Sequence, residues 1–232
     1  MNDYWSDCWK NAHTPWSYQG SDDLAIKRIP EYIAERLTEG APVTSHDLPN
    51  NSLRTFVPLC GDSPIVQFLH EHQCTVTAID LIPSPIRELR EQLFSELTFK
   101  KTTTSTHTTW KAERLSLIEG DFFACSIDQQ FDLIYDRAAL VAIEPQRRAQ
   151  YVEKIMSLLA PHGRLFLEFF DVGEFSASHP PFPIMRQTVR QLFTPLHEVS
   201  FSEQRKKIAD SPFYESPDEE FSRCWIIFEK AR

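Results

Sequence analysis

Hydrophobic positions along this chain alternate between short β-branched runs and longer segments with helical spacing. Residues 55–57 (Thr-Phe-Val) predict a strand that breaks at Pro58, and the apolar positions within residues 65–69 predict a helix. Residues 75–79 (Thr-Val-Thr-Ala-Ile) predict a second strand, which ends at Asp80. A strand, a turn, a helix and an acid-tipped strand in this order are typical of the first half of a nucleotide-binding α/β domain.

The remaining hydrophobic runs extend this pattern to the end of the chain. They predict five more strands, at residues 115–118, 131–135, 165–170, 198–203 and 222–228, and helices at residues 22–37, from Pro85, from Pro145 and at residues 184–193. We therefore expect one domain over residues 1–232, with an N-terminal lid and helix (residues 1–40) before an α/β core (residues 53–232). Its sheet is expected to be doubly wound, mostly parallel and seven-stranded, with a C-terminal antiparallel hairpin. The Thr-rich run of residues 100–111 is expected to be a hairpin insertion or a mobile loop.

The turn after the first strand, residues 57–61 (Val-Pro-Leu-Cys-Gly), contains a single glycine. Gly61 permits unusual backbone dihedrals and a close approach of a ligand, and the following helix directs its N–H groups towards that ligand. Asp80 lies 19 positions after Gly61, the spacing at which an acid binds ribose hydroxyls. Because a pyrophosphate-binding turn has three glycines, the pattern favours a ribose-containing ligand without phosphates, such as S-adenosylmethionine (SAM), over NAD. The alternative is a βαβ unit in which Asp80 is only solvated.

The composition limits the classes of function that the chain can serve. With 24 Lys and Arg against 33 Asp and Glu, the formal net charge is −9, which disfavours nucleic-acid and membrane-surface binding. No hydrophobic run approaches the roughly 18 residues of a membrane span, and the polar N-terminus does not resemble a signal peptide. The five cysteines are scattered without a CxxC pair, and the histidines lack metal-binding spacing. We expect a cytoplasmic protein with reduced thiols and no metal.

Aromatic residues mark two further candidate sites. Trp5 and Trp9 are four positions apart and share one face of a predicted short helix, where they belong either to the core or to a lid that excludes water. After the strand at residues 115–118, Asp121 and Phe122 follow a glycine. An acid followed by an aromatic could bracket an adenine between a polar contact and an apolar wall. A turn with two core phenylalanines explains the same residues.

Several of these segments occur in one characteristic order: Trp5-x-x-x-Trp9, residues 57–61 (VPLCG), Asp80, residues 120–123 (GDFF), residues 131–143 (FDLIYDRAALVAI) and residues 179–182 (HPPF). Together they resemble the thiopurine S-methyltransferase family, and the resemblance extends over most of the chain. PLCG and DRxALVAI are its most specific parts, since ordinary class I methyltransferases have a Gly-rich first turn. The resemblance implies a class I methyltransferase, Rossmann-like fold. It also implies SAM-dependent methyl transfer to the sulfur of a small thiol, with S-adenosylhomocysteine (SAH) as the product.

The resemblance also implies roles for individual residues. The implied cofactor-binding residues are Trp9, Leu59, Gly61, Asp80, Asp121, Phe122 and Arg137. The implied substrate-binding residues are Trp16, Phe182 and Arg205. Arg137 is also the implied catalytic residue, because its positive charge would favour the thiolate form of the acceptor. The structural alternative for Arg137 is a salt bridge to Asp136 or Glu144. A small-molecule acceptor and a monomer are expected from the family.

Departures from the family pattern lie mainly on the substrate side. Asp62 stands where Lys commonly follows PLCG, Ala138 replaces the glycine of DRGAL, and residues 170–178 (FDVGEFSAS) differ from the usual stretch before HPPF. SAM binding is therefore better supported than a thiopurine acceptor. Other thiols, halides, thiocyanate and selenium or tellurium compounds are alternative acceptors. Alternatives from other classes are a nicotinamide-dependent oxidoreductase, which the single-glycine turn disfavours, and a non-catalytic SAM-binding protein.

Overall fold

The computed structural model describes residues 2–14, 16–17, 24–38, 52–172, 177, 179–207 and 220–231. The chain forms two compact units, Met1–Ile127 (unit 1) and Asp128–Arg232 (unit 2). Residues 39–51, between the predicted helix at residues 22–37 and the first predicted strand, lie outside the described residues. A single domain over residues 1–232 stays a prediction.

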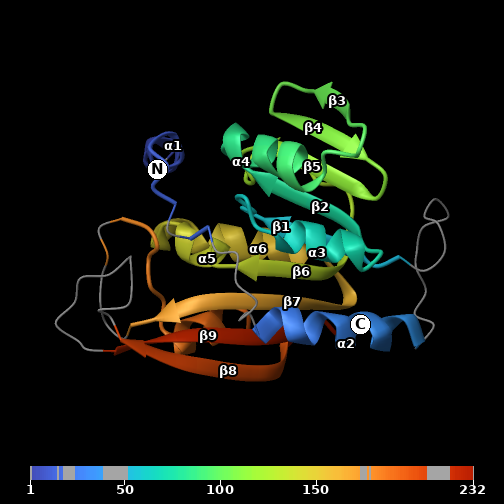
Figure 1. Ribbon diagram of the computed structural model, residues 1–232. Helices are drawn as coiled ribbons and strands as arrows, with labels where there is room; N and C mark the ends of the chain where they lie inside the picture. The colour runs from blue at the N-terminus through green and yellow to red at the C-terminus, as the bar shows by residue number, and fades with distance from the viewer. Residues whose placement is uncertain are drawn as a thin grey trace. The chain divides into compact units, whose positions relative to one another are not determined.

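The strands of unit 1 follow the order β3-β4-β5-β2-β1 (Figure 1). β1 (Arg54–Pro58) pairs in parallel with β2 (Thr75–Asp80), and β2 pairs in parallel with β5 (Leu115–Gly120). Their carboxyl ends therefore meet at one edge, where Asp80 lies opposite Glu119. Four of the five residues of β1 and the four central residues of β2 are buried, which explains why these strands are continuous hydrophobic runs.

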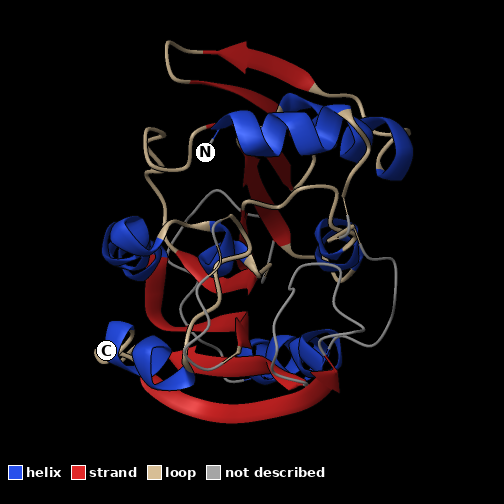
Figure 2. Ribbon diagram, turned by 90° about the vertical axis from the view of Figure 1, so that its left-hand side faces the viewer, coloured by secondary structure: helices blue, strands red, loops and turns tan. Residues whose placement is uncertain are grey.

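Unit 1 also contains four α-helices among its described residues. α3 (Ile65–Glu71) and α4 (Pro83–Glu88) contact β2, and α4 continues as a π-helix (Leu89–Leu93). The helix predicted from Pro85 begins two residues earlier, at Pro83. The N-terminal helices are α1 (Asn2–Lys10), seen beside the N-terminus in Figure 2, and α2 (Leu24–Thr38). None of the described helices combines the length and hydrophobicity of a membrane-spanning helix.

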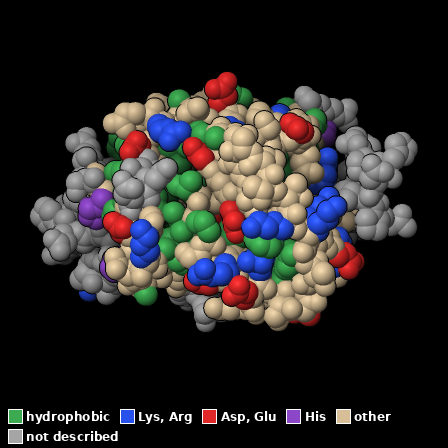
Figure 3. All heavy atoms as spheres, turned by 90° about the horizontal axis from the view of Figure 1, so that it is seen from above, with side chains coloured by type: hydrophobic (Ala, Val, Ile, Leu, Met, Phe, Trp, Pro, Cys, Tyr) green, Lys and Arg blue, Asp and Glu red, His purple; other side chains and the backbone are tan. Residues whose placement is uncertain are grey.

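The Thr-rich run forms a hairpin of β3 (Lys100–Thr103) and β4 (His107–Ala112), and β4 pairs antiparallel with β5. Trp110 stabilises it. Its Nε1–H donates to Glu119 Oε1 at 2.7 Å, and Arg90 Cζ and Lys101 Nζ lie 3.7 and 4.8 Å from its ring centroid. Figure 3 views the hairpin end from above and shows basic and acidic side chains interspersed with hydrophobic ones. Of the two expected structures for this run, the hairpin is the one formed.

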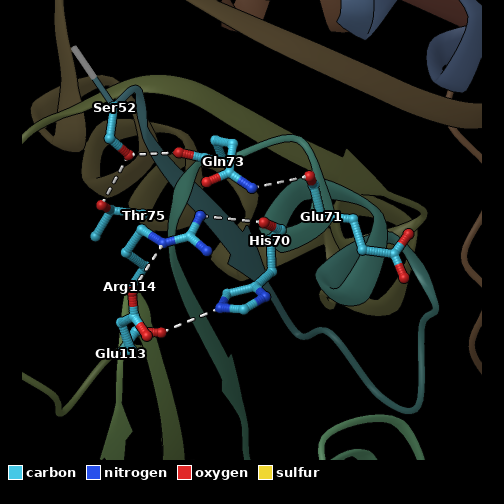
Figure 4. Close-up of polar contacts among 7 residues, drawn as sticks. All are labelled: Ser52, His70, Glu71, Gln73, Thr75, Glu113 and Arg114. Carbon is cyan, nitrogen blue, oxygen red and sulfur yellow. Dashed lines mark hydrogen bonds and ion pairs between the residues drawn. The ribbon is translucent and has the colours of Figure 1, made fainter. Parts of the chain in front are cut away.

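Polar contacts join the amino ends of the parallel strands of unit 1 (Figure 4). The Ser52 hydroxyl before β1 donates to the Gln73 carbonyl before β2 at 2.7 Å. Arg114, before β5, donates from Nη1 to the His70 carbonyl at 3.2 Å and so binds the end of α3. His70 Nε2 lies 3.1 Å from the Glu113 carbonyl oxygen. These contacts hold the strands in register at the end opposite Asp80.

Unit 2 continues the alternation of strands and helices, in the strand order β6-β7-β9-β8. β6 (Phe131–Arg137) pairs in parallel with β7 (Leu159–Asp171), whereas β7 pairs antiparallel with β9 (Glu220–Glu229), and β9 antiparallel with β8 (His197–Lys207). α5 (Ala139–Ala142), a 3-10 helix (Pro145–Arg147) and α6 (Arg148–Leu158) lie between β6 and β7, and α7 (Arg186–Leu192) precedes β8. The predicted element order and C-terminal antiparallel hairpin are confirmed, and β3 and β4 are additional to the seven predicted strands.

The start of β7 differs from the prediction. Gly163 predicts a turn before the strand, but the strand begins at Leu159 and passes through a register shift in its pairing with β6. His162 has a φ of 59° there. A Cβ on Gly163 would lie 2.9 Å from the Phe131 carbonyl oxygen, so the close backbone approach requires glycine. The glycine therefore marks an irregularity inside a strand.

Candidate functional site

The turn after β1 has an unusual backbone conformation. Leu59 and Gly61 have φ values of 46° and 52°, in the left-handed region. Glycine adopts such values without cost, but a leucine there is uncommon, and strained residues of this kind concentrate at ligand sites. Between them, the Cys60 N–H donates to the Ile79 carbonyl at 2.9 Å and fastens the turn to β2. The turn predicted from its glycine is therefore formed by two positive-φ residues.

Asp80 is joined directly to this turn. Its Oδ2 accepts the Gly61 N–H at 2.8 Å, and its Oδ1 accepts the Ile82 N–H at 2.9 Å. Burial raises the pKa of Asp80 to about 6, although these backbone N–H groups act to lower it. Each carboxylate oxygen has a second lone pair, so both can still accept a hydroxyl hydrogen bond. The acid is thus positioned by the turn and retains the capacity that two ribose hydroxyls require.

Trp9 of the N-terminal segment lies against the same turn. A Cβ on Gly61 would be 3.4 Å from Cζ2 of Trp9, so the indole packs on the glycine backbone. Trp16 contacts Trp9 and Trp5 edge-on, with ring centroids 6.0 and 5.1 Å apart. All three rings are only partly buried. In Figure 1 the arrowhead of β2 points to the side on which α1 lies. This position fits the lid alternative, whose closure stays a prediction.

Asp121 and Phe122 follow β5 at the same strand edge as Asp80. Asp121 Oδ1 accepts the Phe123 N–H at 2.9 Å, which closes a tight turn. The Phe122 ring is buried and stacks on Phe56 of β1, with centroids 6.1 Å apart. Phe123 is partly exposed and contacts Phe122 edge-on. The ring of Phe122 therefore belongs to the core, and the exposed aromatic of this turn is Phe123, which the sequence analysis did not single out.

At the end of β6, Asp136 is fully buried and Arg137 is partly exposed. Asp136 Oδ1 accepts the backbone N–H groups of Ala139 and Leu140 at 2.8 and 3.2 Å, and its Oδ2 accepts the Tyr151 O–H at 2.8 Å. Burial raises the pKa of Asp136 to about 7, against the lowering effect of these hydrogen bonds. Asp136 thus holds the start of α5 through Oδ1 and binds α6 through Oδ2.

Arg137 is paired in the sheet with Glu168, whose carboxylate accepts hydrogen bonds from residues of β9. In the parallel register it is opposite Glu168 of β7, so both side chains project from one face. Glu168 is buried and accepts hydrogen bonds from Nε and Nη2 of Arg223, each at 2.9 Å. Trp225 Nε1–H donates to the same carboxylate at 3.0 Å. This bidentate pair offsets the negative charge next to Arg137.

Two other predicted site residues also lie in unit 2. Phe182 is partly exposed, and its segment is held by the buried Arg148, whose Nη2 donates to the Phe182 carbonyl at 2.6 Å. Arg205 is exposed on β8, opposite Ser222 of β9. The structure thus groups Trp9, Trp16, Leu59, Gly61, Asp80, Asp121 and Phe122 in unit 1, and Arg137, Phe182 and Arg205 in unit 2. Arg148 was not among the candidates, because nothing in its local sequence distinguishes it from the neighbouring Arg147.

Comparison with known proteins identifies the family. The sequence profile described as Thiopurine S-methyltransferase (TPMT) matches residues 1–230. The chain belongs to the thiopurine S-methyltransferase family. A thiopurine S-methyltransferase of Vibrio cholerae serotype O1 is 34% identical over 148 residues, which are 62% of this chain and 66% of that protein. The chain thus spans just under two thirds of that relative. One of Aliivibrio salmonicida is 31% identical over 183 residues, which are 77% of this chain and 83% of that protein.

Solved structures share the fold at low sequence identity. The 1,6-didemethyltoxoflavin-N1-methyltransferase of Burkholderia thailandensis, with bound S-adenosylhomocysteine, has a TM-score of 0.64 and 14% identity over 100% of this chain and 87% of that chain. The magnesium protoporphyrin IX methyltransferase of Synechocystis PCC 6803, with bound SAH, has a TM-score of 0.63 and 12% identity over 99% and 98%. The predicted class I methyltransferase fold is confirmed.

Ala138 departs from the thiopurine S-methyltransferase pattern at a position where the backbone favours glycine. It has φ 60° and ψ 12°, and its N–H donates to the Glu168 carbonyl at 3.1 Å. Steric strain of an alanine in the left-handed region lowers the stability of the folded state by about 1–2 kcal/mol. Glycine relieves this strain but gives the unfolded chain more conformational entropy, which lowers stability by about 0.4–1 kcal/mol. We expect Ala138→Gly to stabilise unit 2 by roughly 0.5 kcal/mol in urea unfolding. The control is Ala139→Gly in α5, which should destabilise; equal destabilisation by both would contradict the argument.

Tyr151→Phe is expected to destabilise the protein by about 2 kcal/mol at pH 8, because a buried carboxylate loses a hydrogen-bond donor. Burial raises the folded pKa of Asp136 from 3.8 to about 7, so the native state binds more protons than the unfolded state between these values. Stability from this group therefore falls as the pH rises from about 4 to 7. At pH 5, below the folded pKa, the carboxyl is neutral in the native state with or without the Tyr151 hydroxyl, so the loss of stability should be smaller there.

Urea unfolding at the two pH values measures this prediction, with Asp136→Asn as the matched background. The asparagine does not titrate, so in that background the effect of Tyr151→Phe should be the same at both pH values. A cost that is independent of pH in the presence of Asp136 would show that the hydroxyl does not act through the carboxylate.

Proposed function

We propose that this protein transfers the methyl group of SAM to the sulfur of a small thiol, with a heteroaromatic thiol such as a thiopurine as the acceptor. The observation that carries the proposal is the bond between the Gly61 N–H and the Asp80 carboxylate, which joins the first turn to the acid at the tip of β2. That arrangement fits a ribose close to a backbone without pyrophosphate. Membership of the thiopurine S-methyltransferase family supports the choice of reaction.

The residues of unit 1 fit SAM in distinct ways. Asp80 would accept the ribose hydroxyls, and the positive-φ turn of Leu59 and Gly61 would let the ligand approach the backbone. Asp121 would bind the adenine amine together with the main chain of Phe122, whose ring is committed to the core. Trp9, packed on Gly61, would cover the ligand and exclude water. When bound, SAM supplies a methyl group on a sulfonium, which is a good leaving group for in-line displacement.

The chain's task is then to orient the acceptor and stabilise its reactive form. A thiolate is the attacking species, and a heteroaromatic thiol is substantially ionised near neutral pH, so no strong base is needed. Arg137 would favour the thiolate by its positive charge. The carboxylate of Glu168, opposite it in the register, is bound by Arg223. Phe182 would line the acceptor site, and Arg205 would attract an anionic acceptor.

Isothermal titration with SAM and SAH, followed by turnover assays with mercaptopurine and a panel of small thiols, tests the proposal. Micromolar SAH binding with methylation of a panel thiol supports it. Binding without turnover on any thiol would contradict the acceptor class and direct the search to halides, selenium or tellurium compounds, or to a non-catalytic role. Absence of SAH binding would contradict the assignments of Leu59, Asp80 and Asp121.

A further inference from the structure

Both backbone polar groups of Phe182 are bound by residues that follow Arg137 in the chain. The Phe182 N–H donates to the Val141 carbonyl of α5 at 2.6 Å, and its carbonyl accepts Nη2 of Arg148 at 2.6 Å. Arg148 Nη2 also donates to the Pro183 carbonyl oxygen at 3.3 Å. The segment is rich in prolines, which cannot donate backbone hydrogen bonds, and it has no helix or strand of its own. The position of Phe182 in this segment is therefore set by residues of α5 and α6.

The first turn of α6 carries two anchors. Arg148 and Tyr151 are three positions apart and so project from the same face of the helix. Tyr151 holds Asp136, the residue before Arg137, while Arg148 holds the carbonyl of Phe182. Both anchoring side chains are buried. One helical turn thus fixes both the strand end that carries Arg137 and the segment that carries Phe182.

An arginine at this buried position is not what the stability of the fold alone would favour. Burying a guanidinium loses its hydration, and a well-packed hydrophobic side chain of similar size is often as stabilising. What the guanidinium provides is a rigid planar donor that can reach two successive carbonyls. The geometry therefore suits a precise placement of residues 182–183.

We propose that Arg148 is a positioning residue that fixes Phe182 relative to Arg137 and thereby determines the affinity for the methyl acceptor. The role rests on the proposed methyltransferase function. Arg148 acts through Phe182, so its loss should impair acceptor binding far more than cofactor binding. Because small misplacements of substrate-positioning groups are costly, we expect Arg148→Met to raise the acceptor KM about tenfold to a hundredfold, with a smaller change in kcat.

Amide hydrogen exchange tests the anchoring without any turnover. In a peptide covering residues 179–184, only His179, Phe182 and Ile184 have exchangeable backbone amides, because the others are prolines. Arg148→Met should speed exchange of the Phe182 amide by about tenfold, since local opening becomes easier. The Ile184 amide, which donates to the Phe170 carbonyl at 3.0 Å, serves as the internal reference. Arg148→Lys, which keeps a donor, should restore part of the protection.

The kinetic arm uses mercaptopurine as the acceptor and a matched control at the other end of α6. Lys230 donates to the carbonyls of Met156 and Leu159 at 2.8 and 2.7 Å, so Lys230→Met also removes two bonds from a basic side chain to backbone carbonyls. It should lower stability without raising the acceptor KM. In a Phe182→Ala background, Arg148→Met should add no further increase in KM, because the aromatic side chain whose position Arg148 fixes through the backbone carbonyl is already gone.

The outcomes separate this role from the proposed function. Unchanged exchange of Phe182 in Arg148→Met would overturn the anchoring. Faster exchange with an unchanged KM, or additive effects of Arg148→Met and Phe182→Ala on KM, would overturn the control of acceptor affinity. If the wild-type protein methylated no acceptor, the proposed function would fail and the acceptor role with it, while the exchange data would still decide the anchoring.

Discussion

Asp80→Asn is expected to weaken SAH binding about 100-fold, or ~2.7 kcal/mol, in isothermal titration. Hydrogen bonds to a charged group contribute about 1.5–3 kcal/mol, and the asparagine offers ribose hydroxyls a neutral and weaker acceptor. In the native protein both carboxylate oxygens accept backbone hydrogen bonds, from Gly61 and Ile82. The NH2 group of an asparagine would replace one of these acceptors by a donor, so one of the two bonds would be lost. The substitution therefore disturbs the ligand contact and the turn together.

The pH dependence of binding gives an independent test of the same carboxylate. Burial raises the pKa of Asp80 to about 6, and ribose hydroxyls donate best to the ionised form. Affinity for SAH should therefore be full above about pH 6 and fall as the pH drops below it, whereas Asp80→Asn should show no such fall.

The matched control for Asp80→Asn is Asp62→Asn. It removes the same charge one residue after Gly61, and Asp62 contributes to the raised pKa of Asp80. We expect its affinity for SAH to stay within about twofold of the wild type. Wild-type affinity in Asp80→Asn, or an equal loss in Asp62→Asn, would contradict the ribose-binding role.

The elements were predictable because burial makes each parallel strand a continuous hydrophobic run. Leu133 and Ile134 of β6 are fully buried, and such runs separated by helical periodicity indicate an α/β fold without knowledge of any contact. The spacing of Gly61 and Asp80 also constrained the site, because a βαβ unit places the first turn and the second strand tip together. For these elements the hydrophobic pattern of the sequence agrees with the folded structure, so the sequence alone was enough to predict them.

The parts that could not be predicted depend on which of two similar neighbours faces the core. Phe122 and Phe123 are adjacent and identical in type, yet Phe122 is buried and stacks on Phe56, whereas Phe123 is partly exposed. Arg147 and Arg148 are likewise adjacent, and the buried one is defined by carbonyls some 34 residues later in the chain. Hydrophobic periodicity describes the element to which a residue belongs, but not a long-range contact made by one side chain at an element boundary.

Arg137→Ala is expected to lower kcat/KM for mercaptopurine about 100-fold, because the acceptor thiolate loses a charged partner, and a hydrogen bond to a charged group contributes about 1.5–3 kcal/mol. SAH affinity should change little, because we assign the ribose and adenine contacts to Asp80 and Asp121. Without the positive charge the thiol ionises less readily, so the pH profile of kcat/KM should also move to higher pH. Steady-state kinetics across a pH series, with SAH titration on the same preparations, measures both effects.

Arg205→Ala is the matched control, since it removes the same side chain from an exposed position on β8. An exposed charge attracts an anionic acceptor only weakly through solvent, so this variant should raise KM by a few-fold and leave the pH profile in place. A uniform drop in rate for Arg137→Ala without a shift in the pH profile would mean that Arg137 positions the acceptor rather than stabilising its thiolate. Full turnover in Arg137→Ala would remove Arg137 from the mechanism. The hydrogen bonds of Asp136 and Tyr151 at the end of β6 would then serve the structure alone.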